Sequence, residues 1–241
     1  MAEEQMPKVL AFDVFGTVVD WRTSIAAESA KFLQRIGRAD LDAATFTDKW
    51  RFRYLAVMKC SAEAERGFTV LDVLHREMLE DTLRAAGIDP SGLDGALLHD
   101  WAFAWRRLAP WPDSVAGLAR LKTGFPIVTL SNGNIALMLE LARRAGLPWD
   151  AILGAEVTQA YKPEPRAYLG TAEILGLRPG ELCLVAAHHS DLAAARACGL
   201  QTAYVARPDE YGGRRTADDA AAQDWDWSAD SILALADQLG C

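Results

Sequence analysis

Paired cysteines are missing from this sequence, and with them the usual signs of a redox or zinc-binding protein. The 241 residues include four cysteines, Cys60, Cys183, Cys198 and Cys241, and no two of them form a C-x-x-C pair. Three of the four stand among apolar residues, so we expect free, buried thiols. That state fits a protein of the reducing cytoplasm.

Runs of basic residues and long apolar runs are also missing. The chain has 33 acidic and 25 basic residues, with a formal net charge of -8, which argues against nucleic acid as a partner. No apolar stretch approaches the length that spans a bilayer, and residues 1–8 lack the apolar segment of a secretory signal. We therefore expect a cytoplasmic protein that does not bind membranes. An anionic substrate would need cations placed locally in its site, because the overall charge repels it.

The sequence does contain the alternation of strands and helices that is typical of an α/β fold. With 51% hydrophobic and 24% charged residues, the composition is that of a globular protein. Short apolar segments predict five buried strands, at residues 9–15, 126–130, 151–157, 182–187 and 202–206. Apolar positions at helical spacing predict helices between them, at 134–145, 165–175 and 191–198. This order predicts a Rossmann-like parallel sheet with helices on both faces.

The segment 21–108 differs from the rest because it lacks convincing strands. Its apolar periodicity predicts four amphipathic helices, at 24–36, 43–59, 69–86 and 93–108. Pro110 and Pro112 mark the return to strand-forming sequence. We therefore predict an α/β hydrolytic core made of residues 1–20 and 109–241, with a helical cap, 21–108, inserted after the first strand.

Polar residues follow four of the predicted strands, at the edge where ligand sites of open parallel sheets form. Asp13 lies at the end of the first strand, and Ser131 and Asn132 at the end of the second. Lys162 follows the third strand and Asp191 the fourth. Each has an ordinary structural explanation by itself, because D-x-x-G-T is often a turn and Ser-Asn before a helix is usually an N-cap. Four such segments in this order favour a catalytic site.

These four segments resemble the four motifs of the haloacid dehalogenase superfamily, and the helical insert matches the position of that family's small cap. The resemblance spans nearly the whole chain. It implies a hydrolase in which Asp13 is a covalent nucleophile, oriented by Thr17 and kept ionised by Lys162. Asp191 is the implied candidate to orient or activate water, together with His188.

Two departures from the phosphatase pattern of this superfamily bear on the reaction. Phosphatases of this type carry a second Asp two residues after the nucleophile, which protonates the leaving group, and this chain has Phe15 there. They also hold Mg²⁺ with an acidic residue four positions before Asp191, where this chain has Ala187. Halide leaves as a stable anion without a general acid. Both departures therefore favour dehalogenation without a metal or another cofactor.

The resemblance to 2-haloacid dehalogenases extends to the residues that bind substrate. The implied catalytic residues are Asp13, Thr17, Lys162 and Asp191, and the implied substrate-binding residues are Val14, Phe15, Arg51, Ser131, Asn132, Tyr168 and His188. Arg51 resembles the cap arginine that faces the departing halide. The alternative interpretation of Arg51 is a solvated helix residue without a role in the site. Tyr168 has the alternative of a helix residue packed on the core.

The histidines give no sign of a metal site. His188 and His189 are adjacent, and neighbouring residues rarely bind one ion without further ligands, of which none is evident. We expect His188 to be a hydrogen-bonding pocket residue and His189 to be structural. His75 and His99 fall in predicted cap helices, where surface or core positions are expected. By the resemblance, His188 replaces an Asn of the best-known dehalogenases, while Ala186 replaces a Ser and Ser190 a Trp.

The function that this resemblance implies is hydrolysis of short 2-haloalkanoic acids, such as chloroacetate or (S)-2-chloropropanoate, to 2-hydroxy acids through an aspartyl ester. Fluoroacetate is a further candidate substrate, and a homodimer formed through the cap is a family-level expectation. Two alternatives stay open. One is a phosphatase or phosphonate hydrolase on the same fold, and the other is a non-catalytic protein that kept the fold and binds a partner.

Overall fold

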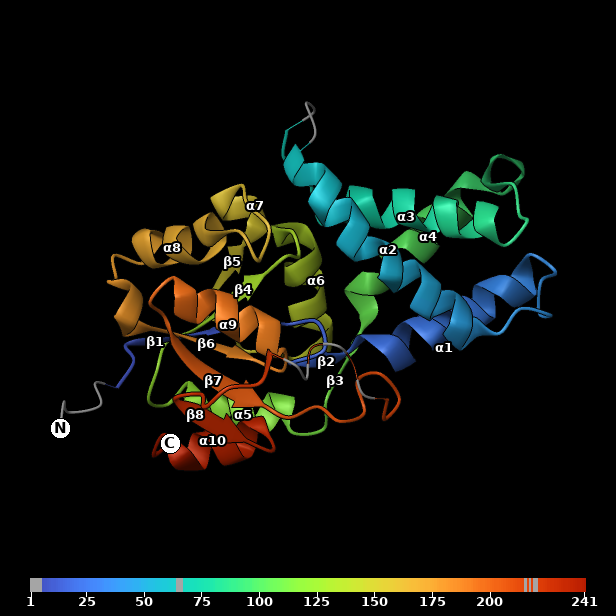
Figure 1. Ribbon diagram of the computed structural model, residues 1–241. Coiled ribbons are helices and arrows are strands. Elements are labelled where there is room, and N and C mark those ends of the chain that lie inside the picture. The colour runs from blue at the N-terminus through green and yellow to red at the C-terminus, as the bar shows by residue number, and fades with distance from the viewer. Residues whose placement is uncertain (1–5, 64–66, 215, 217, 219–220) are drawn as a thin grey trace.

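The centre of the molecule is a parallel β-sheet (Figure 1). The computed structural model describes residues 6–63, 67–214, 216, 218 and 221–241, with the side chains of 55–63 excepted. Within these residues, six strands pair in the order β5 (Ala151–Gly154), β4 (Ile127–Ser131), β1 (Val9–Phe12), β6 (Leu182–Ala186), β7 (Gln201–Val205) and β8 (Trp227–Ala229). All neighbouring pairs are parallel, which confirms the predicted α/β fold.

Both faces of the sheet are covered, as the nearly continuous apolar strands require. In β1, Leu10 and Phe12 belong to one hydrophobic cluster and Val9 and Ala11 to the other, because successive side chains point to opposite faces. The first cluster is completed by helices α5 (Ser114–Leu121), α6 (Ile135–Ala145) and α10 (Ile232–Gln238). The second is completed by α8 (Pro165–Ile174) and α9 (His189–Ala197).

The structure corrects the predicted strand at 151–157. β5 ends at Gly154, whose φ of 138° suits only glycine, and the next residues form the short helix α7 (Ala155–Thr158). A short apolar run has the same appearance in a strand and in a buried helical turn. The predicted helix 93–108 is divided into α4 (Gly95–Ala102) and the 3₁₀ helix η2 (Phe103–Arg107). Helices α5 and α10 and strand β8 were not predicted.

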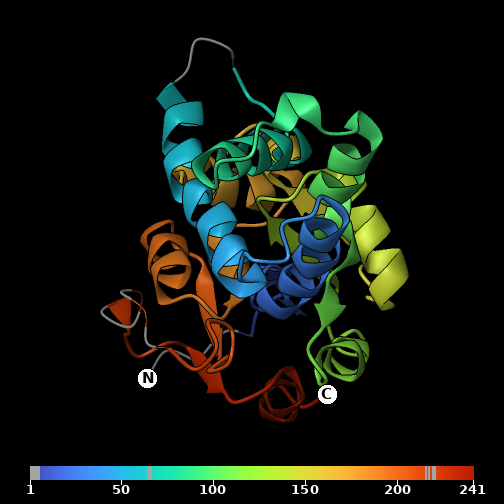
Figure 2. The same ribbon diagram turned by 90° about the vertical axis from the view of Figure 1, so that its right-hand side faces the viewer.

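The helical insert leaves and rejoins the core through one small antiparallel pair. β2 (Val19–Asp20) pairs with β3 (Ala109–Pro110), so the two ends of the insert lie side by side. Between them come α1 (Trp21–Arg35), α2 (Ala43–Glu63), α3 (Leu71–Ala85), η1 (Pro90–Gly92), α4 and η2. Figure 2 shows these helices in front of the core. Their position agrees with the predicted insert, while its status as a separate cap domain stays a prediction.

Two smaller observations concern the predicted environment of the chain. Among the described residues, none of the helices combines the length and apolarity needed to cross a bilayer. Cys183, Cys198 and Cys241 are free thiols, while the side chain of Cys60 lies outside the described residues. The cytoplasmic location, the lack of a nucleic-acid partner and the homodimer stay predictions.

Candidate active site

The carboxyl ends of the central strands bring the predicted polar residues together. Asp13 is the first residue after β1, Ser131 is the last of β4, and Lys162 follows α7. His188 and Asp191 lie at the start of α9, directly after β6. Because β4, β1 and β6 are adjacent and parallel, their ends form one edge. Residues far apart in the sequence therefore meet there.

Asp13 is buried and held by cationic and hydroxyl donors. Its Oδ1 accepts a hydrogen bond from Lys162 Nζ at 2.9 Å, and its Oδ2 accepts one from Thr17 Oγ1 at 2.7 Å. The backbone N–H of Ala187 donates to Thr17 Oγ1, which fixes that hydroxyl. Burial by itself would raise the pKa of Asp13, but Lys162 and His188 outweigh it and hold the pKa far below its ordinary value. Asp13 is therefore an ionised carboxylate.

Lys162 is held between two carboxylates. Its Nζ donates to Asp191 as well as to Asp13, and its backbone N–H donates to Asn132 Oδ1 at 2.8 Å. Burial would lower the pKa of Lys162, but Asp13 and Asp191 raise it above its ordinary value. The other oxygen of Asp191 accepts from the Tyr168 hydroxyl at 2.6 Å. Both carboxylate oxygens of Asp191 are thus engaged.

The remaining predicted core residues line the same edge. Val14 and Phe15 are buried directly after Asp13, and Ser131 is fully buried. Ser131 Oγ accepts from the backbone N–H of Gly133 at 3.1 Å, which leaves its own proton available to donate. The structure therefore brings these residues together with Asp13, whereas their roles toward a substrate stay predictions.

His188 bridges Asp13 and a carboxylate that sequence reasoning missed. Its Nδ1 lies 3.1 Å from Asp13 Oδ2, and its Nε2 lies 3.0 Å from each oxygen of Glu210. Glu210 is only 3% exposed and comes from the loop after β7. Burial would lower the pKa of His188, but Glu210 and Asp13 raise it well above its ordinary value. In this state His188 is an imidazolium.

Arg51 of α2 lies in a cage of aromatic side chains. Its guanidinium carbon lies 4.2 Å from the ring centre of Tyr54, 5.3 Å from that of Trp21 and 5.8 Å from that of Trp105. Its Nη1 is buried and has no hydrogen-bond partner among the residues that the structure describes. Burial raises the pKa of Tyr54, and Arg51, Lys162 and Asp13 also act on it, so this part of α2 lies near Asp13. Arg51 is not the solvated residue of the alternative interpretation.

The other three histidines lie outside this group. His189 stacks on Tyr204 and Trp225, as expected of a structural residue. His75 is buried and stacks on Trp105 at 4.5 Å, and burial, with Arg51, holds its pKa well below its ordinary value. His99 is exposed.

The arrangement does not fit the Mg²⁺ site of the superfamily's phosphatases. Ala187 offers no side-chain oxygen at the position of the phosphatases' acidic ligand, and the two oxygens of Asp13 face an ammonium and an imidazolium. A divalent cation there would meet both positive charges. In the described part of the chain, no three His, Cys, Asp or Glu side chains are grouped so that they could hold a metal ion.

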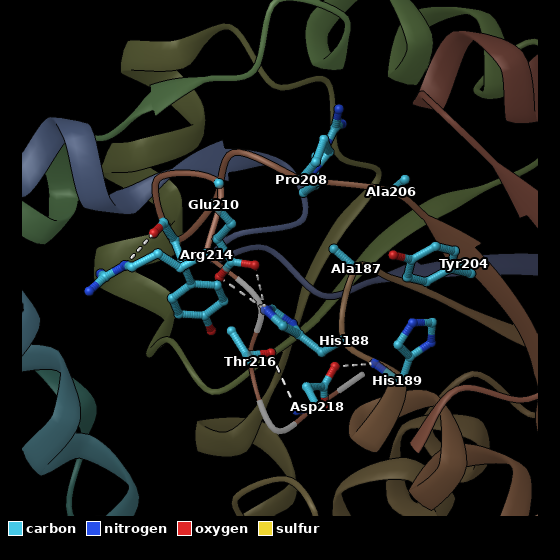
Figure 3. Close-up of a pocket in the computed structure, with 13 residues that line it drawn as sticks. Ala187, His188, His189, Tyr204, Ala206, Pro208, Glu210, Arg214, Thr216 and Asp218 are labelled. Carbon is cyan, nitrogen blue, oxygen red and sulfur yellow. Dashed lines mark hydrogen bonds and ion pairs between the residues drawn. The ribbon is translucent and has the colours of Figure 1, made fainter. Parts of the chain in front are cut away.

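A cavity of about 470 Å³ lies beside this group on the side of the β7 loop. His188 and Glu210 line it together with Tyr211, Arg214 and Asp218. Figure 3 shows the Glu210 carboxylate turned toward the His188 ring. Asp13 is not among the lining residues, so His188 stands between the cavity and Asp13.

Known proteins match the chain over most of its length. A family model of haloacid dehalogenase-like hydrolases matches residues 7–199. The (S)-2-haloacid dehalogenase of Xanthobacter autotrophicus is 31% identical over 84% of this chain and 76% of its own. A phosphoglycolate phosphatase of Neisseria meningitidis is 28% identical over 90% and 88%. The crystal structure of a defluorinating L-2-haloacid dehalogenase superposes with a TM-score of 0.93 at 48% identity, covering 98% of this chain and 96% of that one.

Proposed function

The chain belongs to the haloacid dehalogenase-like hydrolases, and we propose that it hydrolyses short 2-haloalkanoic acids to 2-hydroxy acids. The observation that carries this proposal is the environment of Asp13. The carboxylate is buried and ionised between Lys162 and His188, so it is a nucleophile without a bound metal. The position that holds a general acid in phosphatases is Phe15, and halide is a leaving group that needs none.

In the first step, Asp13 attacks the carbon that bears the halogen. A new C–O bond forms as the carbon–halogen bond breaks, with inversion at that carbon, and halide leaves with the bonding electrons. The product of this step is an ester of Asp13. Lys162 and Ser131, with the backbone amides of Val14 and Phe15, hold the carboxylate of the substrate, and Thr17 keeps Asp13 oriented.

Negative charge grows on the halogen on the side opposite Asp13. Arg51 and Asn132 are the donors proposed for that position, and the buried, unpartnered Nη1 of Arg51 is available for it. Because Nη1 is buried beside aromatic rings, its interaction with a departing anion is stronger than it would be in water. Fluoride depends most on such donors because it is the poorest leaving group among the halides. Fluoroacetate is therefore included in the substrate panel.

In the second step, water attacks the carboxyl carbon of Asp13 and releases the 2-hydroxy acid. Asp191 and His188 are the two groups available to orient or activate that water. Asp191 also keeps Lys162 in place between itself and Asp13. The product leaves as a 2-hydroxy acid, and the carboxylate of Asp13 is regenerated.

The direct test is halide release from chloroacetate in the presence of EDTA. We expect turnover that chelation does not reduce. Loss of turnover in EDTA that Mg²⁺ restores would contradict the proposal. Mg²⁺-dependent release of phosphate from a generic phosphate ester would favour the phosphatase alternative instead. If the protein turns over neither the haloacids nor the phosphate esters, a non-catalytic binding protein is favoured.

A further inference from the structure

The two ring nitrogens of His188 both face carboxylates in the resting site. Nδ1 faces Asp13 at 3.1 Å and Nε2 faces Glu210 at 3.0 Å. An imidazole between two carboxylates donates through both nitrogens. In this state it has no lone pair with which to take a proton from water. Its position beside the Asp13 carboxylate nevertheless suits a base for the second step.

We propose that His188 and Glu210 form the base that activates water in the second step, and that ester formation on Asp13 is what frees His188 to act as one. The inference rests on the proposed function, because it needs the Asp13 ester. His188 is the catalytic residue of the pair, and Glu210 is a positioning residue that acts through it.

The switch follows from the charges around His188. Ester formation removes the negative charge of Asp13, so among the described residues Glu210 remains as the carboxylate hydrogen-bonded to the imidazolium. Burial favours the neutral ring, and the two carboxylates oppose that preference in the resting state. Once Asp13 is neutral, His188 releases its Nδ1 proton to solvent. Glu210 retains the Nε2 proton and so fixes the tautomer with a free Nδ1 lone pair toward the ester.

The second step then balances without another reactant. Water attacks the carboxyl carbon of Asp13 and gives one proton to His188 Nδ1, while the C=O electron pair moves to oxygen. That pair returns as the C–O bond to the product breaks, and the leaving alkoxide takes the proton from Nδ1. The second water proton passes from the new carboxyl group of Asp13 to Nδ1. This restores the carboxylate and the imidazolium.

The position of Glu210 is specified from several sides. Trp21 Nε1 donates to its Oε1 at 2.9 Å. On its other side lies Gly16, with a φ of 88°, in the turn directly after the nucleophile. A Cβ at Gly16 would lie only 2.1 Å from Glu210 Oε1, so the absence of a side chain there is what admits the carboxylate. The sequence predicts Gly16 only as a turn residue. In the structure it also leaves the space that the Glu210 carboxylate occupies.

Asp191 is less suited to be the base. Its two oxygens already accept from Lys162 and Tyr168, and only His188 of these two candidates contacts Asp13 directly. The cavity of about 470 Å³ that His188 and Glu210 line has room for water next to the pair. The other titratable groups that interact with His188 are Tyr211 and Asp218, which line the same cavity.

The test separates the two steps in five variants, Glu210→Gln, Glu210→Asp, His188→Asn, Asp191→Asn and the control Glu181→Gln. Glu181 is also a buried glutamate, but it lies at the start of β6, at the opposite end of the strand from His188. Glutamine at 210 would donate to Nε2 and move the ring proton to Nδ1, which is the wrong tautomer for a base. Rapid quenching with chloroacetate measures the halide burst, and intact-protein mass spectrometry measures the ester on Asp13.

For Glu210→Gln and His188→Asn we expect steady-state turnover to fall by on the order of 10²–10⁴-fold, with a halide burst that persists and an ester that accumulates. Glu210→Asp should recover part of the loss, and Glu181→Gln should match the parent. Ester hydrolysis in the parent should slow at acid pH as His188 is protonated, and this dependence should vanish in His188→Asn. A structural defect alone would slow both steps together and would leave no ester.

Three results would overturn the inference. If the burst falls as much as turnover, His188 acts in the first step, for example as a donor to halide. If Asp191→Asn accumulates ester while Glu210→Gln does not, Asp191 is the base. If neither variant accumulates ester while both turn over like the parent, the pair has no catalytic part. A parent that releases no halide would refute the proposed function, and this inference with it.

Discussion

Replacing Arg51 by methionine removes the guanidinium but keeps most of the apolar stem. In the proposed first step, Arg51 stabilises the charge that grows on the halogen, and loss of one such donor costs on the order of 10²–10³ in rate, or about 2.7–4 kcal/mol. We therefore expect chloride release from chloroacetate to fall by about that factor in Arg51→Met. Bromoacetate should suffer less, because bromide is the better leaving group.

Arg51→Met should change the free energy of unfolding by less than it changes the activation free energy, because two contributions to stability oppose each other. Contacts of the guanidinium with its three rings stabilise the fold by about 0.5–2 kcal/mol each. The buried Nη1 without a partner costs about 1–3 kcal/mol. A net change of about 2 kcal/mol would shift the melting temperature by roughly 4–8 °C. Assays well below that temperature then report on catalysis alone.

The matched control is Arg53→Met, on the same helix two residues further on. It should leave halide release unchanged, and Arg51→Lys should recover only part of the rate because an ammonium lacks the guanidinium's planar set of donors. If Arg51→Met releases chloride at the parent's rate, the proposed role of Arg51 is wrong and the cage serves only the packing of the helices.

Two further predictions concern the charges in the core. Lys162→Met leaves His188 alone to oppose the effect of burial on Asp13, so the pKa of this carboxyl should rise. A pH profile of halide release should then show its acid limb moved to higher pH, with turnover reduced by at least about 10²-fold; an unmoved limb would contradict this. His75 is buried, and its pKa is held below the ordinary 6.5. Below pH 6.5 the unfolded chain therefore binds a proton that the folded protein does not. As the pH is lowered, the free energy of unfolding decreases by up to about 1.4 kcal/mol per pH unit. Urea unfolding should therefore show His75→Phe gaining about 2 kcal/mol on the parent between pH 7 and pH 5, and a constant difference would refute the assignment.

The sequence predicted the candidate site best for residues that stand at or after the carboxyl ends of predicted strands. Asp13, Lys162 and Asp191 each follow an apolar segment, and parallel pairing then places them at one edge of the sheet. That Lys162 pairs with Asp13 came from the family resemblance, and the structure has them 2.9 Å apart. Periodicity alone would not have specified that contact, because it says nothing about which loops meet.

The residues that were missed depend on tertiary contacts. Glu210 stands in a polar turn after β7 and resembles any surface carboxylate, yet it is 3% exposed because the loop folds back over Gly16 and His188. Tyr54 lies one helical turn from Arg51, so helical spacing brings these two side chains together, whereas the contacts of Arg51 with Trp21 and Trp105 depend on how the helices pack. The glycine within D-x-x-G-T, Gly16, is the one sequence feature that the position of Glu210 requires.

The central claim is that Asp13 carries the substrate as an ester, and a single turnover in ¹⁸O-labelled water tests it most directly. With enzyme in excess over chloroacetate, the oxygen that enters the product comes from Asp13 and the water oxygen replaces it. The account predicts label in the Asp13 carboxylate, measured on the peptide that contains it, and unlabelled glycolate. Label in the glycolate of the first turnover, with none in Asp13, would mean that water attacks the substrate directly and would contradict the account.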